Sequence, residues 1–169
     1  MTVNLMGRKG ITIFSDASVF HKKKLSGYGV WAKGDGRDPL ILKGKIDPYE
    51  QSVTTCELIG LYAGLVNVCK SYLENDDSYI LLQSDSTQAL GVIKTFAMAK
   101  NHPHSTSAKV NHYRKAKSRL KKGALAINRL RIEYKIDLYI RHVRGHNPGG
   151  GRNYINRLLD NLAKEAANS

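Results

Sequence analysis

The sequence predicts a mixed α/β fold, and three observations carry that prediction. Residues 10–18, GITIFSDAS, form an apolar run of β-branched and aromatic residues that suits a buried strand. Two alternating stretches, GYGVWAKG and PLILKGKI, follow, with the turn residues GDGRDP between them. A helical pattern then precedes a second apolar run, SYILLQSDS. The first three stretches predict an antiparallel meander, and the last is expected to lie parallel to the first because a helix crosses between them.

The first predicted strand ends in Asp16, where the chain emerges at the edge of the sheet. A lone aspartate at such a place is most often a turn residue. A buried strand that delivers one carboxylate is also a recurrent way to place a metal ligand, so both readings stay open at this point. The connection that follows, FHKKKLSG, is an exposed loop, and its Lys22 and Lys23 are either phosphate contacts or part of a solubilising turn.

Residues 54–70 have the periodicity of a helix with an aliphatic stripe. Glu57 lies in the first turn of this predicted helix and forms a T-x-x-E capping box with Thr54, which is a sufficient structural reason for a glutamate there. Asp85 closes the second apolar strand and is open to the same interpretation, because it precedes a helix predicted over 86–98. Two strands that both end in Ser-Asp nevertheless indicate a site, since ligands gather at the carboxyl ends of adjacent parallel strands.

The net charge of +13 is concentrated in the C-terminal part of the chain. Residues 100–169 hold 16 basic and 4 acidic residues, whereas residues 1–99 hold 11 and 10. The spacing of apolar residues predicts a long amphipathic helix over 108–131, or two helices broken near Gly123. Lysines and arginines occupy most of the remaining surface of this segment, which we call the cationic rail. This charge density favours a nucleic-acid partner over a merely solvated surface. The candidate contacts on the rail are Lys115, Lys117 and Lys121.

The C-terminal segment adds a strand, KIDLYIRHV, and a closing helix. His146 follows the strand in a glycine-rich loop, where a lone histidine is more often a surface residue than a catalyst. The apolar stripe of the helix puts Asn156 and Asp160 one turn apart toward its flank. Asp160 either belongs to a site or pairs with Lys164 at i,i+4.

Length and composition bound the class of protein. At 169 residues the chain is expected to be a single domain, with residues 1–9 as a flexible N-terminal tail. No apolar run long enough to span a membrane and no signal peptide are present, so a soluble, cytoplasmic protein with no membrane partner is expected. Cys56 and Cys69 lie about 20 Å apart along one predicted helix, too far for a disulfide, and are expected to be reduced thiols in the core.

Taken in chain order, these residues resemble the type 1 ribonuclease H family over about residues 10–166. Each motif alone is a weak signal, but this order on these element types is specific. The matching positions are Asp16 in FSDAS, Glu57 in TTCELIGLYAGL, Asp85 in LLQSDSTQAL, His146 in VRGHNP, and Asn156 and Asp160 in NRLLDNLAKEA.

The resemblance implies an RNase H-like fold, with a five-stranded mixed sheet ordered 3-2-1-4-5, a central first strand and helices on both faces. Asp16, Glu57, Asp85 and Asp160 would converge there as catalytic ligands of two Mg²⁺ ions, for which Mn²⁺ can substitute. The implied activity is hydrolysis of the RNA strand of RNA/DNA hybrids by an endoribonuclease, leaving 5′-phosphate and 3′-hydroxyl ends. His146 would assist proton transfer or product departure.

The resemblance also implies how the hybrid is read. Groups after the first Asp and before the helix Glu contact the RNA 2′-hydroxyls in the family, which corresponds here to positions around Ser18 and Thr54. The cationic rail would hold phosphates of the DNA strand, and sequence specificity should be low. The loop FHKKKLSG departs from the Gly-Pro-rich loop of the bacterial form, and Trp31 is the only tryptophan. We expect a monomer that needs no small-molecule cofactor.

Other classes of function remain as alternatives. A junction resolvase of related fold would share the metal chemistry but prefer four-way DNA, and a catalytically silent module would only bind nucleic acid. The intact acidic set argues against the silent module, because unused buried carboxylates are destabilising. A proofreading exonuclease would need Asp-x-Glu where Asp16-Ala17-Ser18 stands, and a transposase or integrase core would carry a Glu on the late helix in place of Asp160.

Overall fold

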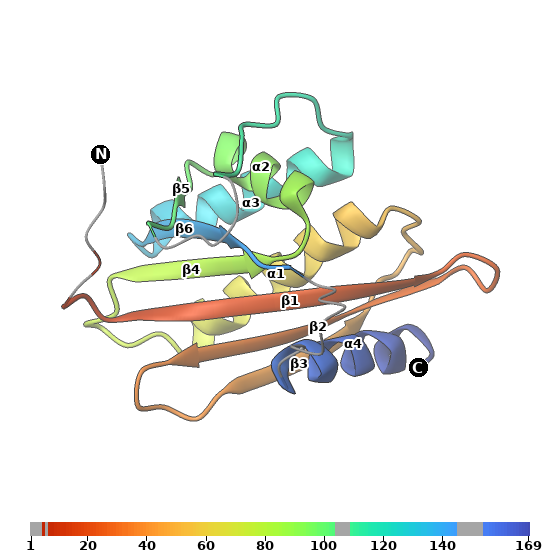
Figure 1. Ribbon diagram of the computed structural model, residues 1–169, viewed down its shortest axis with the longest axis horizontal. Coiled ribbons are helices and arrows are strands. Elements are labelled where there is room, and N and C mark those ends of the chain that lie inside the picture. The colour runs from red at the N-terminus through yellow and green to blue at the C-terminus, as the bar shows by residue number, and fades with distance from the viewer. Residues whose placement is uncertain (1–4, 6, 104–108, 145–153) are drawn as a thin grey trace.

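The computed structural model describes residues 5, 7–103, 109–144 and 154–169. The strands are β1 (Gly10–Phe20), β2 (Leu25–Gly34), β3 (Leu40–Lys45), β4 (Tyr79–Ser84), β5 (Lys100–Asn101) and β6 (Asp137–His142). The helices are α1 (Val53–Ser71), α2 (Thr87–Phe96), α3 (Ser118–Glu133) and α4 (Tyr154–Ala167). Together they form a mixed α/β fold around one central sheet (Figure 1).

The sheet has the order β3-β2-β1-β4-β6-β5. β1 pairs antiparallel with β2 and parallel with β4, and β6 continues the parallel part. This confirms the predicted strand order, with β6 as the fifth predicted strand. A sixth strand is present because Lys100 and Asn101 pair with β6 at the edge. Two residues are too few to produce a hydrophobic alternation that a sequence could reveal.

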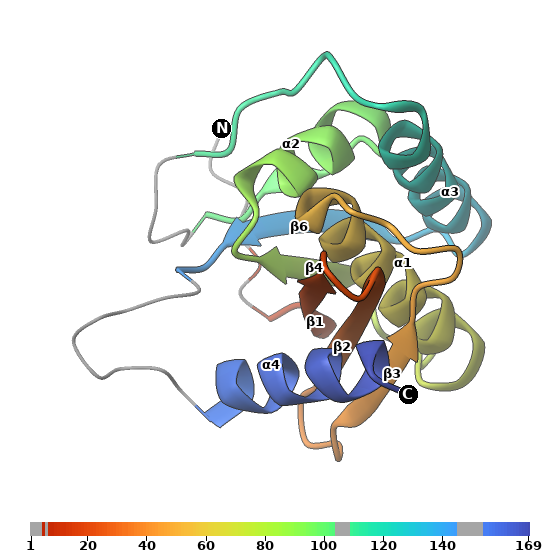
Figure 2. The ribbon, with the colours of Figure 1, turned by 90° about the vertical axis from the view of Figure 1, so that its right-hand side faces the viewer.

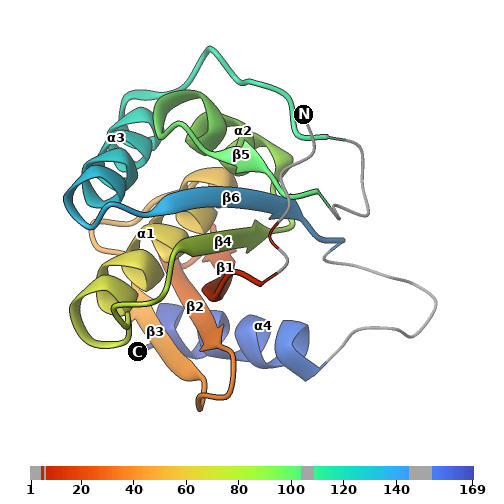
Figure 3. The ribbon, with the colours of Figure 1, turned by 90° about the vertical axis from the view of Figure 1, so that its left-hand side faces the viewer.

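Helices cover both faces of the sheet (Figures 2 and 3). α1 packs against β1 and β2, where the absent side chain of Gly64 leaves room for Ile13 and Val30. α4 packs on the opposite face against β1, β2 and β3, and there a Cβ on Gly29 would lie 2.8 Å from the carbonyl oxygen of Leu159. Successive residues of β2, such as Gly29 and Val30, thus face different helices, as the pleat requires.

The third helix differs from the prediction. α3 begins at Ser118, and residues 109–117 are not helical. This segment instead lies against α2, because the Tyr113 backbone N–H donates to Thr95 Oγ1 at 3.0 Å and Lys94 Nζ donates to the Val110 carbonyl at 2.8 Å. The three-to-four spacing of apolar residues continued through this segment, which is why the sequence predicted a helix there. α3 itself packs on α1 and α2.

The core confirms the prediction for both cysteines. Cys56 and Cys69 are buried free thiols of α1, and burial raises the pKa of Cys56 to about 12 and that of Cys69 to about 11. Both thiols are therefore protonated at neutral pH and act as packing groups.

At the N-terminus, Arg8 forms an ion pair with Asp137 at 2.8 Å and Lys9 one with Asp76 at 2.9 Å, which fastens the last residues of the predicted tail to the sheet. Among the helices of the described ranges, none has the length and apolar character needed to cross a bilayer.

Candidate active site

The candidate site forms where β1 runs on past the end of β4. The pairing of these two strands ends at Phe14 opposite Gln83, so among the described residues β1 has no strand partner on that side from Asp16 onward. The backbone N–H of Ala17 is therefore not used in the β1–β4 ladder. It donates instead to Asp16 Oδ1 at 2.9 Å and to Glu57 Oε1 at 3.2 Å. The uncovered edge of the central strand thus supplies a donor for two carboxylates.

Glu57 comes to this edge from α1. The predicted capping box with Thr54 is wrong, because the N-cap is Ser52, whose side chain accepts from the Thr55 backbone N–H at 3.2 Å. Glu57 lies in the second turn, only 2% exposed, and its own backbone carbonyl accepts a bond from Ser15 Oγ at 3.2 Å. Helix capping therefore does not explain why a glutamate occupies this position. A buried carboxylate at this position requires a different explanation.

Asp85 follows β4 in the turn before α2. Here too the cap is the neighbouring serine, because Ser86 Oγ accepts from the Ala89 backbone N–H at 3.2 Å. The carbonyl oxygen of Asp85 lies 3.1 Å from His142 Nε2, at the end of the next parallel strand. His142 was not among the predicted site residues. Its position follows from the register of the structure, in which Ser84 and His142 are paired at the ends of β4 and β6.

Asp16, Glu57 and Asp85 converge as predicted. Each offers a carboxylate oxygen, and these three oxygens lie within 4.8 Å of one another. They open onto a pocket of about 320 Å³ that Asp160 and Thr54 also line. A set of oxygen-only donors at this spacing is what a hard divalent cation such as Mg²⁺ prefers.

Asp160 reaches the pocket from α4 on the other face of the sheet. Gly29 is paired with Asp16 across β1 and β2, and its missing side chain lets the α4 backbone at Leu159 approach the sheet. Asp160 also forms the i,i+4 ion pair with Lys164, at 2.8 Å. Asp160 thus lines the pocket and is at the same time paired with Lys164.

Electrostatics make the three-carboxylate cluster unfavourable on its own. Burial raises the pKa of Glu57 well above its ordinary value, and the nearby Asp16 and Asp85 add to the effect. Burial, followed by the charge of Asp85, also raises the pKa of Asp16. Oε2 of Glu57 is buried and has no hydrogen-bond partner among the described residues. A bound cation would supply the missing partner and relieve the repulsion, so these residues fit a divalent metal.

Of the two residues predicted to contact the RNA 2′-hydroxyls, Thr54 is the one that lines this pocket. Its Oγ1 donates to Gln88 Oε1 at 3.2 Å, a pairing of α1 and α2 that the sequence did not indicate. Ser18 lies in β1 opposite Gly27, past the end of the β4 pairing. His146 is outside the described residues.

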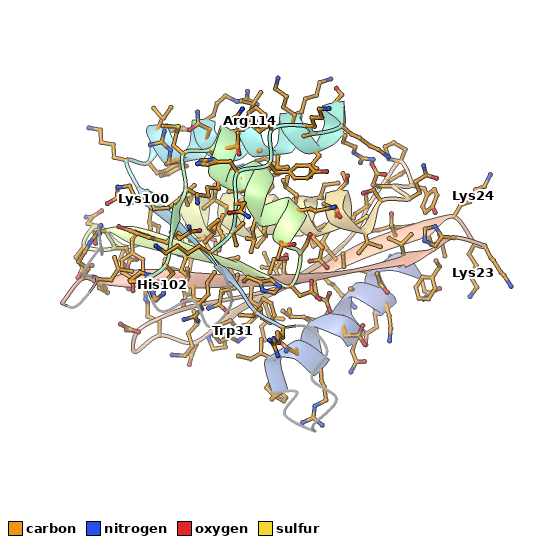
Figure 4. The ribbon with its side chains drawn as sticks, turned by 45° about the horizontal axis from the view of Figure 1, so that its top comes forward. Lys23, Lys24, Trp31, Lys100, His102 and Arg114 are labelled. Carbon is orange, nitrogen blue, oxygen red and sulfur yellow. The ribbon has the colours of Figure 1, made fainter. Side chains whose placement is uncertain are left out.

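The predicted basic contacts are exposed. Lys22 and Lys23 lie at the tip of the β1–β2 hairpin, well away from the sheet's centre, as the label of Lys23 shows in Figure 4. Lys115 and Lys117 precede α3, so the prediction that they lie on a helix is wrong. Lys121 lies on α3, and its Nζ is 5.2 Å from the centre of the Phe96 ring. Arg119 pairs with Glu50 at 3.4 Å, which brings the start of α3 beside the loop that leads into α1.

Comparison with known proteins agrees with this geometry. No curated protein matches the chain. RNase H1 from the halophilic archaeon Halobacterium salinarum NRC-1 is similar in structure, with a TM-score of 0.62 at 16% identity, and 94% of this chain and 97% of that chain are covered. LC11-RNase H1, isolated from compost by a metagenomic approach, gives 0.61 at 18% identity, with coverage of 94% and 96%.

The N-terminal RNase H domain of Rv2228c from Mycobacterium tuberculosis gives a TM-score of 0.63 at 16% identity, with 95% of this chain and 94% of that chain covered. At these identities the solved structures establish the fold. The sequence profile of RNase H matches residues 8–168, a range that includes all four carboxylates of the pocket. The chain therefore belongs to the RNase H family.

Proposed function

We propose that this protein is an endoribonuclease that hydrolyses the RNA strand of RNA/DNA hybrids and leaves 5′-phosphate and 3′-hydroxyl ends. The observation that carries the proposal is the convergence of Asp16, Glu57 and Asp85, with oxygens within 4.8 Å of one another, in a chain of the RNase H family. The similar LC11-RNase H1 was solved in complex with an RNA/DNA hybrid, which supports the choice of substrate.

The carboxylates would hold two Mg²⁺ ions, with Mn²⁺ as a substitute. Bound divalent ions supply Lewis-acid chemistry, which lowers the pKa of an attacking water and stabilises charge on the leaving 3′ oxygen. Asp16 is suited to contact both neighbouring carboxylates' ions because its strand pairs with β4, which leads to Asp85, and packs against α1, which carries Glu57. Asp160, on α4, would complete the ligand set once it leaves Lys164.

The remaining residues would bind and orient the substrate. Thr54, on the rim of the pocket, and Ser18, farther along the uncovered edge of β1, are suited to contact the ribose 2′-hydroxyls beside the cut. His146 follows β6 closely in the chain and would assist proton transfer or product departure, so its loss should slow turnover without abolishing it. Nothing in this set reads base edges, and we therefore expect little sequence preference.

The basic residues before and on α3 would hold phosphates of the DNA strand. Lys117 is adjacent in sequence to α3, whose Arg119 contacts Glu50 in the loop before α1. This loop leads directly to Thr54 and Glu57. The basic residues before and on α3 thus begin next to the end of α1 that lines the pocket. A duplex that lies over the pocket would therefore reach these basic residues.

A panel of labelled nucleic acids tests the proposal. An RNA/DNA hybrid, an RNA duplex, a DNA duplex and a four-way DNA junction are incubated with the protein in Mg²⁺ and, in parallel, in EDTA. Cleavage of the RNA strand of the hybrid alone, only with Mg²⁺, is the expected result. Preferred cleavage of the junction would point to a resolvase, and binding without cleavage of any substrate would point to a silent binding module; either result would overturn the proposal.

A further inference from the structure

The β1–β2 hairpin extends far beyond the rest of the sheet (Figure 1). Its ladder continues without a break from Asp16 opposite Gly29 to Phe20 opposite Leu25, well past the last β1–β4 pair. Phe20 lies four positions beyond Asp16 along the strand, so their Cα atoms are about 13 Å apart. The turn that follows, residues 21–24, therefore lies roughly 15 to 20 Å from the carboxylates.

This turn is held in place from both sides. Lys24, at φ 52°, donates its backbone N–H to the His21 carbonyl at 3.3 Å and closes the turn. The His21 ring nitrogen Nδ1 lies 3.1 Å from the hydroxyl of Tyr49, in the loop that leads into α1. The hairpin tip is thus connected to the same loop that carries the pocket-lining end of α1.

Three consecutive lysines occupy the turn, and Figure 4 shows Lys23 and Lys24 projecting from it. Lys22, Lys23 and Lys24 are exposed, and none of them forms an ion pair with a described residue, although Lys23 Nζ lies 6.0 Å from the centre of the Phe20 ring. Lys43 of β3, by contrast, forms an ion pair with Glu165 at 3.0 Å. Adjacent like charges without partners repel one another, and a polyanion would relieve that repulsion.

We propose that this lysine tip, residues 22–24, binds the phosphate backbone of the hybrid about five base pairs away from the cut. The estimate follows from the 15 to 20 Å between tip and carboxylates, divided by a rise of about 3.4 Å per nucleotide. The inference rests on the proposed hybrid substrate and adds a second anchoring point. The tip comes from a different element than the basic residues of α3, so the duplex is held at two separate places with the carboxylates as the third.

The test compares two variants that lose the same charge. Lys22→Gln/Lys23→Gln changes the tip, and Lys33→Gln/Lys70→Gln changes lysines at the far ends of β2 and α1. The substrate carries a short block of ribonucleotides in an otherwise DNA strand, so that the position of the cut is fixed. Its duplex is shortened step by step on either side of the block, and single-stranded DNA or RNA overhangs show which strand is contacted.

The tip variant is expected to lower kcat/KM severalfold on long duplexes and to have no effect once one side is shorter than about five base pairs. The control variant should match the wild type at every length. In parallel, fluorescence anisotropy in EDTA measures the binding constant K for the full hybrid at several salt concentrations. The slope of log K against log salt should become shallower by about one to two in the tip variant alone.

Equal behaviour of the two variants, or a length-independent loss in the tip variant, would overturn the anchoring role. Failure of the proposed function would appear differently, as wild-type protein that leaves the ribonucleotide block uncut. The anisotropy measurement would still decide the role of the lysine tip in that case, because it does not depend on cleavage.

Discussion

The backbone N–H of Ala17 donates to Oε1 of Glu57 at 3.2 Å, across the edge of the sheet that β4 leaves uncovered. This bond orients one oxygen of a carboxylate that is otherwise buried. The other oxygen, Oε2, lacks a hydrogen-bond partner among the described residues. The same N–H also donates to Oδ1 of Asp16 at 2.9 Å, so two of the three clustered carboxylates share one backbone donor of β1.

Replacing Asp16 with asparagine should separate catalysis from stability. Asp16→Asn removes a charge from a cluster in which burial and Asp85 already raise the pKa of Asp16. We expect cleavage to fall by more than about a hundredfold, as expected when several kcal/mol of transition-state stabilisation are lost. The thermal midpoint in metal-free buffer should be equal to or higher than that of the wild type, because repulsion is relieved.

Asp35→Asn is the matched control, since Asp35 is exposed in the turn after β2. Asp35→Asn should leave both the cleavage rate and the thermal midpoint unchanged. Near wild-type cleavage by Asp16→Asn would remove this residue from the site.

The pH dependence of stability should report on Glu57. Burial, together with Asp16 and Asp85, raises its pKa well above 4.5 in the folded state. Between 4.5 and the raised pKa the folded state holds a proton that the unfolded chain has released. The free energy of unfolding in EDTA should therefore fall as the pH rises through this interval and become level above it.

Urea denaturation of the wild type and of Glu57→Gln at a series of pH values measures this effect. The variant should show a flatter profile, while Glu133→Gln, at the exposed end of α3, should follow the wild type. A wild-type profile that rises with pH across the same interval would contradict the assigned shift.

Lys164 should compete with metal for Asp160. The two side chains pair at 2.8 Å and are 52% and 25% exposed, so the pair is worth at most about 1 kcal/mol. Removing it with Lys164→Gln should lower the Mg²⁺ concentration for half-maximal activity by up to about fivefold. A titration of activity with Mg²⁺ measures the shift. Lys43→Gln, which breaks the comparable surface pair with Glu165, should leave the midpoint in place; an unchanged midpoint in Lys164→Gln would mean that Lys164 does not compete with the metal for Asp160.

Much of the fold followed from the sequence because its signals are local. The apolar run of β1 and the helical stripe of α1 identify their elements, and the helix between β1 and β4 fixes their parallel pairing. The segment 109–117 was misread because its apolar spacing matches a helix, whereas hydrogen bonds to Thr95 and Lys94 hold it on α2. Those partners are distant in sequence, and no local pattern reports them.

The site was predicted from the order of its carboxylates rather than from any one of them. The motif Thr54-x-x-Glu57 looks like a capping box, and only the structure shows that Ser52 is the cap. Likewise the contact of His142 with the Asp85 carbonyl follows from the register of β4 and β6. Side-chain direction at a helix start and strand register are tertiary facts, which a single sequence does not contain.

The basic residues near α3 should govern the affinity for the hybrid. We expect Lys115→Gln/Lys117→Gln/Lys121→Gln to weaken binding and to reduce the slope of log K against log salt by up to about 2.7, if all three contact phosphates. Lys33→Gln/Lys70→Gln/Lys135→Gln carries the same change in charge away from the pocket and should leave most of the slope intact. Identical slopes for the two triple variants would mean that the surface near α3 faces away from the duplex.

The chemical nature of the product ends tests the central claim most directly. Attack by a water activated at the carboxylate cluster leaves a 5′-phosphate and a 3′-hydroxyl, whereas attack by the neighbouring 2′-hydroxyl leaves a 2′,3′-cyclic phosphate and a 5′-hydroxyl. We predict that the RNA fragments from a hybrid cut in Mg²⁺ carry 5′-phosphates, as mass spectrometry would record. Fragments that end in 2′,3′-cyclic phosphates, formed equally well in EDTA, would contradict the proposed role of Asp16, Glu57 and Asp85.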